Sequence, residues 1–229
     1  MTREAVWALI QEDQRLRGLK RDVEARLTDT VHGPVADDPA HDFAHFIRVA
    51  LWTIKLSQGR ADPVCAIAAA LLHDIVNVPK NHPDRARASE LSAEVARELL
   101  PKHGFTPAET DDICEAVRDH SFSRGAVPQR MLAKCLQDAD RLEGLGSLGI
   151  FRLISTGVKM NAKYFDAEDP WARRRPLDDK SFSVDHFFTK LFKLPDLMNT
   201  QQGKQEALNR VALMKTFVEQ LGEELGDPS

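Results

Sequence analysis

The stretch AIAAALLHDIVNV, residues 66–78, decides the fold of this chain. Its residues are apolar on nearly every side of a helix, which predicts a helix at the centre of a core. His73 and Asp74 interrupt the apolar run, and no Lys or Arg stands within a helical turn of Asp74. A buried carboxylate is costly unless it is paired or bound to a cation. The sequence therefore predicts a distant partner for Asp74, and a metal ion is a good candidate.

Helical patterns surround this central segment, and Pro and Gly separate them. No run alternates like a β-strand for long enough to indicate a sheet. Ala, Leu, Glu, Lys and Arg are plentiful, which also favours helices. The sequence thus predicts an all-α protein, with helices over residues 3–27, 41–58, 63–76, 84–103, 107–121, 128–140 with a continuation to 156, 184–194 and 204–225.

A length of 229 residues suits one sizeable core. We therefore expect a single domain over residues 1–229, with its core at about 28–156. In residues 157–183 apolar residues no longer recur at helical spacing, and Asp, Arg and Pro take their place. This composition is typical of a long loop or lid. Residues 184–225 are expected to add closing helices.

Charge and composition exclude several classes of protein. The net charge is −4 and no basic stripe is visible, which argues against a nucleic-acid partner. The longest apolar stretch, Val64 to Val78, is too short and too polar to cross a membrane. The N-terminal segment is charged and lacks the apolar core of a signal peptide. Cys65, Cys114 and Cys135 are far apart and are expected to be buried thiols, so we expect a cytoplasmic protein.

A second polar feature lies in the expected helix 41–58. His41, His45, Arg48 and Trp52 share one stripe of that helix, opposite the apolar one. Carboxylates follow in LQDADRLE, at Asp138 and Asp140. Imidazole and carboxylate together suit a divalent Mn, Fe, Co, Ni, Zn or Mg ion, and the residues do not choose among these metals. Open positions on such an ion would bind water and a phosphate oxygen.

Three of these stretches follow the order of a known signature. HDFAHFIRV (41–49), LLHDI (71–75) and DADRLEGLG (138–146) resemble the HD superfamily of metal-dependent phosphohydrolases, closest to its small stand-alone bacterial members. DHFFTKLFKLPDLMNTQQGK (185–204) is similar to that branch as well. The resemblance implies a compact HD-domain helical bundle with a metal site between central helices, and it implies the ligands His45, His73, Asp74 and Asp140.

Two points remain open within that resemblance. Helical geometry alone does not choose between Asp138 and Asp140, since their side chains point about 200° apart. The resemblance favours Asp140, which stands just before Arg141. Several family members also carry a Glu three residues after the HD aspartate, where this chain has Asn77, which does not titrate. Proton transfer would then fall to Asp74, to a nearby histidine or to the bound water itself.

Further basic residues are candidates for contact with a substrate. Lys80, His82 and Arg85 follow the central helix and are expected to meet phosphate oxygens, although a solvated loop explains them equally well. His120 ends a helix and is a candidate for catalysis, phosphate binding or a second metal, or for a structural role. Lys190 is a weaker candidate for the substrate.

Other residues have plainer interpretations. We interpret Arg48 as a residue that orients an acidic ligand, and His41 as a brace rather than a ligand. Gly144, Gly146 and Gly149 spell G-x-G-x-x-G, but no strand precedes them. Close helix packing explains these glycines better than a dinucleotide site does.

These observations favour a metal-dependent phosphohydrolase. The catalytic residues would be Asp74, His73 and His120. The substrate would be a phosphorylated small molecule, and a nucleotide is favoured. The favoured reaction is pyrophosphohydrolysis. The alternative is a non-catalytic nucleotide-binding or sensor module of the same fold. A nucleic-acid-binding regulator is the weakest hypothesis, because the chain is acidic. A helical protein of this size is also a candidate homodimer.

Overall fold

The computed structural model describes residues 1–27, 43–76, 87–121 and 124–227. Within these ranges the regular secondary structure is helical, apart from one isolated bridge between Lys163 and Phe182. The predicted all-α class is therefore confirmed. The chain divides into two compact units, Met1–Asp140 and Arg141–Ser229. The single domain stays a prediction, and each unit is described by itself.

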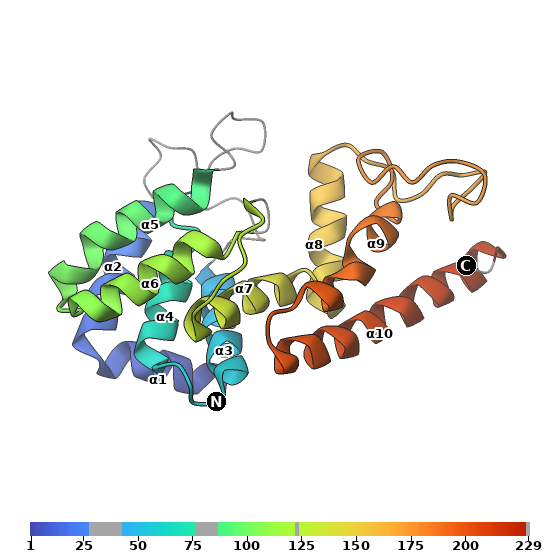
Figure 1. Ribbon diagram of the computed structural model, residues 1–229. Helices are drawn as coiled ribbons and strands as arrows, with labels where there is room; N and C mark the ends of the chain where they lie inside the picture. Colours follow the sequence, from blue (N-terminus) through green and yellow to red (C-terminus); the bar gives the residue numbers. More distant parts are fainter. Residues whose placement is uncertain (28–42, 77–86, 122–123, 228–229) are drawn as a thin grey trace. The chain divides into compact units, whose positions relative to one another are not determined.

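The first unit is a bundle around α4 (Figure 1). The helix α4 packs against α1, α2, α3, α5 and α6. A 3₁₀ helix, η4, continues α5. The helices of this unit are α1 (Arg3–Glu12), α2 (Gln14–Leu27), α3 (Phe43–Ser57), α4 (Pro63–Leu72), α5 (Ala88–Leu99), η4 (Leu100–His103), α6 (Pro107–Asp119) and most of α7 (Met131–Glu143).

The central helix α4 is as buried as its sequence predicts. Residues 65–72 are each at most 5% exposed. Asp62 begins the helix, because its carboxylate accepts hydrogen bonds from the amides of Val64 and Cys65. The regular helix ends at Leu72, earlier than the predicted Val76. At that end, the ring of His73 donates to the carbonyl oxygen of Ala70, which the amide of residue 74 would otherwise use.

The first predicted helix, 3–27, is in fact two helices. Asp13 separates α1 from α2 with an extended backbone conformation. Its carboxylate accepts hydrogen bonds from the amides of Arg15 and Leu16, so it caps the first turn of α2. An apolar pattern that continues through the break does not reveal it, whereas the capping aspartate does.

A second break divides the predicted helix over 128–156. The helix α7 ends at Glu143, and α8 (Gly146–Lys159) follows. Gly146 has φ of 70°, which favours glycine. A Cβ on Gly149 would lie 2.3 Å from the carbonyl oxygen of Gly144. Close packing therefore explains the glycines of this turn, as the sequence indicated.

The second unit contains α8, α9 (Asp185–Thr189), the 3₁₀ helix η6 (Leu191–Leu197) and α10 (Gln201–Leu225). The helix α10 packs against α8 and η6. Residues 160–184 form no regular helix; the loop was predicted over 157–183, so α8 continues three residues beyond its expected end. In that segment the carboxylate of Asp169 accepts hydrogen bonds from the amides of Arg173, Arg174 and Arg175. A lid role for the segment stays a prediction.

None of the described helices is both long enough and apolar enough to span a membrane.

Candidate metal centre

Three helices of the first unit bring two histidines and an aspartate together. His45 lies on α3, His73 follows the end of α4, and Asp140 lies on α7. The Nε2 atoms of His45 and His73 are 3.2 Å apart. Asp140 Oδ1 lies 3.8 Å from each of them. Both imidazoles are fully buried, so their nitrogens converge inside the bundle, whereas the side chain of Asp140 is 27% exposed.

A second group shares His73 with the first. Asp74 Oδ2 lies 3.6 Å from His73 Nε2, and Asp74 Oδ1 lies 3.4 Å from His120 Nε2. His120 is the residue after α6 and is 4% exposed. In each group, one donor atom per residue lies within 4.8 Å of the others. We call the five residues the His/Asp centre: His45, His73, Asp74, His120 and Asp140.

Backbone carbonyls orient two of the imidazoles. His73 donates from Nδ1 to the carbonyl oxygen of Ala70 at 2.7 Å. His120 donates from Nδ1 to the carbonyl oxygen of Val117 at 2.6 Å. In the neutral ring, these bonds place the hydrogen on Nδ1 and leave Nε2 with a lone pair toward the centre, the usual arrangement for a metal-binding histidine.

The electrostatics of the centre favour a positive charge. Burial by itself lowers the pKa of His73, but the carboxylates of Asp74 and Asp140 and the carbonyl of Ala70 outweigh it and raise the pKa to about 9. Burial by itself raises the pKa of Asp140, but the hydrogen bond and charge of His73 lower it below its usual range. A site that attracts a proton this strongly also attracts a cation.

The donor set fits a divalent metal ion. Two neutral imidazoles whose Nε2 atoms face each other repel, unless a proton or a cation lies between them. His45 and His73 are in that position, with the carboxylates of Asp74 and Asp140 beside them. Nitrogen and oxygen donors without a thiolate suit Mn, Fe, Co, Ni, Zn or Mg, so the arrangement does not choose among these metals.

The structure separates the two acidic candidates on α7. The side chain of Asp140 is 27% exposed and faces both histidines. Asp138 is fully buried and belongs to neither group of possible metal donors. The expectation that Asp140 rather than Asp138 lies at the centre therefore agrees with the geometry, and its role as a ligand stays a proposal.

The remaining candidates from the sequence lie elsewhere. His41, Asn77, Lys80, His82 and Arg85 fall outside the described residues. Lys190 belongs to the second unit, where it separates α9 from η6. The hydrogen bond of His186 lowers the pKa of Asp179 most, against the effect of burial; the hydrogen bond of Thr189 and the charge of Lys190 lower it further.

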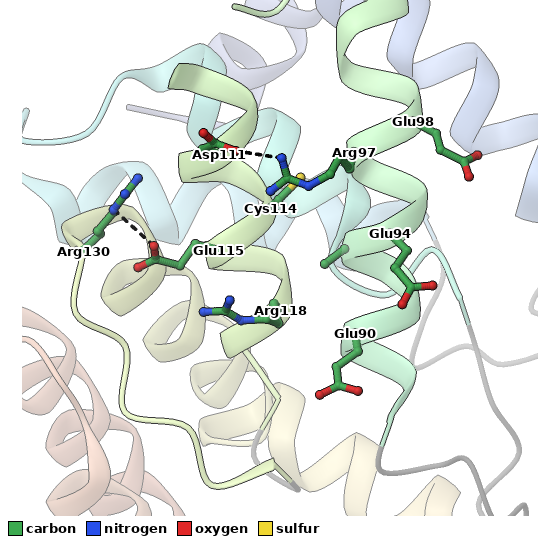
Figure 2. A pocket seen from close by; sticks show the side chains of 10 residues that line it. Glu90, Glu94, Arg97, Glu98, Asp111, Cys114, Glu115, Arg118 and Arg130 are labelled. Carbon is green, nitrogen blue, oxygen red and sulfur yellow. Dashed lines mark hydrogen bonds and ion pairs between the residues drawn. The ribbon is translucent and has the colours of Figure 1, made fainter. Parts of the chain in front are cut away.

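A polar cavity that the sequence analysis missed lies in the first unit between α5 and α6 (Figure 2). Its volume is about 760 Å³, and no residue of the His/Asp centre lines it. Arg97 pairs with Asp111 across the two helices at 2.7 Å, and Arg130 pairs with Glu115 at 3.2 Å. We call this cavity the α5–α6 groove; its lining residues are Glu90, Ala93, Glu94, Arg97, Glu98, Asp111, Cys114, Glu115, Arg118 and Arg130.

The charges that line the groove make it a poor phosphate site. Five of the lining residues are acidic and three are arginines. The arginines already pair with carboxylates, Arg118 through two bonds of 2.8 Å to Asp119. Phosphate binding needs cations that are not already neutralised. The sequence signal for the groove was charged residues every three or four positions on both helices, which usually marks only a solvated face.

Comparisons with known proteins agree with this arrangement. The family model of the HD domain matches residues 42–145. The chain is 31% identical over 209 residues to the uncharacterized protein YpgQ of Bacillus subtilis, covering 89% of this chain and 90% of YpgQ.

Solved structures are similar over nearly the whole chain. The crystal structure of Bacillus subtilis YpgQ in complex with ADP has a TM-score of 0.69 and 26% identity, covering 92% of this chain and 96% of that one. An HD-superfamily hydrolase from Bacillus thuringiensis has a TM-score of 0.66 and 27% identity, with the same two coverages.

Proposed function

This chain belongs to the HD domain family, and we propose that it hydrolyses a phosphate ester or anhydride bond in a nucleotide with the help of a divalent metal ion. The observation that carries the proposal is the convergence of two groups of metal donors on one histidine, His73. A buried cluster of this kind is costly to build without a bound cation, which makes a purely structural role a weak explanation.

We propose His45, His73, Asp74 and Asp140 as the residues that hold the ion. When bound, such an ion lowers the pKa of water and neutralises negative charge on a phosphoryl group. The helices α3 and α7 supply His45 and Asp140, and the turn directly after α4 supplies His73 and Asp74. Rigid placement of this kind lets a site present fixed dipoles and charges to a reacting phosphate without reorganisation.

His120 is the proposed proton carrier of the reaction. Its Nδ1 is held by the carbonyl of Val117, so Nε2 is the atom that can exchange a proton with substrate or water. Asp74 Oδ1 lies 3.4 Å from that Nε2, within reach of a proton that the ring carries. Since Asn77 replaces the Glu that several family members carry, His120 and Asp74 are the residues left to give or accept the proton.

A nucleotide is the proposed substrate class, because Bacillus subtilis YpgQ, 31% identical to this chain, has been crystallised with ADP. In the favoured reaction, water attacks the α-phosphorus of a nucleoside triphosphate. The bond to the bridging oxygen breaks, and pyrophosphate leaves together with a nucleoside monophosphate. Lys80, His82 and Arg85 are proposed to bind the phosphates, with Lys190 as a further candidate.

The test compares wild-type protein with Asp74→Ala and with a control, Asp111→Ala, which removes a carboxylate from the α5–α6 groove. Elemental analysis measures the metal per chain, and a panel of nucleoside mono-, di- and triphosphates measures turnover. We expect one or more metal ions per chain and phosphate or pyrophosphate release in wild type and in the control. Asp74→Ala should lose both.

Each other outcome has a definite meaning. Metal without turnover on any nucleotide would replace the hydrolase proposal by the nucleotide-binding or sensor module. Full activity of metal-free Asp74→Ala protein would overturn the proposed mechanism. No metal after reloading with manganese, cobalt or nickel would show that the proposed ligand set is wrong.

A further inference from the structure

His120 depends on the end of α6 for its position. It is the residue that follows the last residue of α6, Asp119, and its ring bonds to the carbonyl of Val117 in the last turn. The rings of His73 and His120 meet edge to face, with centroids 4.9 Å apart. A shift of the helix end would therefore move Nε2 of His120 away from Asp74.

The end of α6 is fixed by an unusual set of side chains. The last carbonyls of a helix have no intrahelical partner and must bond elsewhere. Here each of the last three carbonyl oxygens of α6 accepts from a side chain. Val117 accepts from His120 at 2.6 Å, Arg118 from Arg124 at 3.3 Å, and Asp119 from Gln137 at 2.7 Å.

Gln137 is the donor among these three that reaches across from another helix. It lies on α7, three residues before Asp140, so both side chains occupy the same side of that helix. It is 1% exposed, and its Nε2 donates a second bond to the carbonyl oxygen of Ala126 at 3.1 Å. Both bonds end on carbonyls, so the amide nitrogen must be the atom that faces them.

We propose that Gln137 is a positioning residue for His120. Through the carbonyl of Asp119 it ties the end of α6 to the helix that carries Asp140, and it thereby keeps His120 facing Asp74. A buried donor with two carbonyl partners holds a backbone segment more firmly than a solvent-exposed bond, because water cannot replace it. The kinetic part of this inference rests on the proposed function, and the placement of His120 does not.

The test uses two substitutions and one matched control. Gln137→Met removes the donor and keeps an unbranched side chain, and Gln137→Glu keeps the shape but turns the donor into an acceptor. Gln129→Met is the control, because Gln129 also donates its amide to a carbonyl, that of Val127, at an exposed position.

The direct readout is the imidazole of His120 in protein that carries ¹⁵N-labelled histidine and bound zinc. A long-range ¹H–¹⁵N spectrum distinguishes the two ring tautomers, and His120→Ala assigns the signals. Wild type and Gln129→Met should show His120 with its hydrogen on Nδ1, and the Gln137 variants should show averaged tautomers. Unchanged His120 signals in both Gln137 variants would overturn the inference, whatever the activity of the protein.

The kinetic readout is a double-mutant cycle. Gln137→Met should lower kcat by about 10- to 100-fold at unchanged metal content, by analogy with residues that orient metal ligands through hydrogen bonds. In the His120→Ala background, the same substitution should change kcat by less than about twofold, because its effect passes through His120. Losses that multiply would show that Gln137 acts independently of His120. Absence of turnover in wild type would defeat the proposed function instead, and the spectrum would still decide this inference.

Discussion

The His/Asp centre and the α5–α6 groove both gather ionisable side chains within the first unit, but in opposite ways. The centre has five such residues, and its histidines are almost completely buried. The groove has eight charged residues, and Arg97 and Asp111 are each 58% exposed at their side chains. In the groove, opposite charges neutralise each other in water. In the centre, imidazole nitrogens and carboxylate oxygens converge in two groups that could hold a metal ion.

The comparison shows which kind of charge indicates function. Solvated ion pairs contribute little to stability and perturb their partners weakly. Buried groups that converge without Lys or Arg shift one another's pKa values in opposite directions: Asp74 and Asp140 raise the pKa of His73, and His73 lowers the pKa of Asp140. The number of charged residues alone would indicate a functional site in the groove. Burial and convergence of the side chains indicate one in the His/Asp centre instead.

The largest expected effect separates the two aspartates of α7. Asp140→Asn removes a proposed ligand and should weaken metal binding by at least about 100-fold, with turnover lost in parallel. Asp138→Asn should keep the metal but lower the free energy of unfolding by about 1–3 kcal/mol, because Asp138 is fully buried. Metal titration and urea unfolding measure both quantities. Metal loss in Asp138→Asn alone would reverse the assignment.

The next effect concerns the proton carrier. His120→Ala should lower kcat by about 100-fold or more, because general acid–base catalysis contributes about that much. The metal content should stay near that of wild type, since the other four residues of the centre are intact. Elemental analysis and steady-state kinetics on the nucleotide that wild type prefers provide the measurement. Complete metal loss in this variant would instead make His120 a ligand that the centre requires.

Much of the fold could be predicted from local patterns. The apolar run of α4 predicted a buried helix, and the glycines at 144–149 predicted close packing; the structure bears both out. Predicted helix ends were less accurate, because side chains compete for backbone groups there. The ring of His73 donates a hydrogen bond to the carbonyl of Ala70. The carboxylate of Asp13 accepts hydrogen bonds from amides in the first turn of α2.

The candidate site could be predicted only in part. Motif order named His45, His73, Asp74 and Asp140, but helical periodicity alone left Asp138 and Asp140 open. No local pattern distinguishes Gln137 from any other glutamine, because its partners, Asp119 and Ala126, are set by how α6 and α7 pack. Long-range contacts of this kind depend on the whole bundle.

A smaller effect concerns a charge at the start of α6, one of the two helices of the groove. Glu109 and Thr106 form a capping box, and Arg15 lies 3.1 Å from Glu109. The amide and hydroxyl of Thr106 lower the pKa of Glu109 most; burial opposes them, and Arg15 lowers the pKa further. Since the folded pKa lies below the unfolded one, the stability that the carboxylate contributes is present at neutral pH and is lost as the pH falls through the folded pKa.

Glu109→Gln should therefore lower the free energy of unfolding by about 1 kcal/mol at pH 7, the usual contribution of a cap. The difference from wild type should begin to shrink as the pH falls below the ordinary glutamate pKa of about 4.3, and it should be lost as the folded wild-type carboxylate is protonated. Urea unfolding between pH 7 and pH 3 measures it. Metal content and turnover should not change. A difference that grows in acid would contradict the assigned direction of the pKa shift.

The smallest effect is expected inside the groove. Arg97→Gln removes the ion pair with Asp111, whose two partners are mostly exposed, so the free energy of unfolding should change by less than about 0.5 kcal/mol. Raising the salt concentration should abolish even that difference, because solvent ions screen exposed pairs. Turnover and metal content should match wild type. A loss of activity comparable to that of His120→Ala would show that the groove contributes to the catalytic site. Paired, solvated charges would then be no less functional than buried, convergent ones.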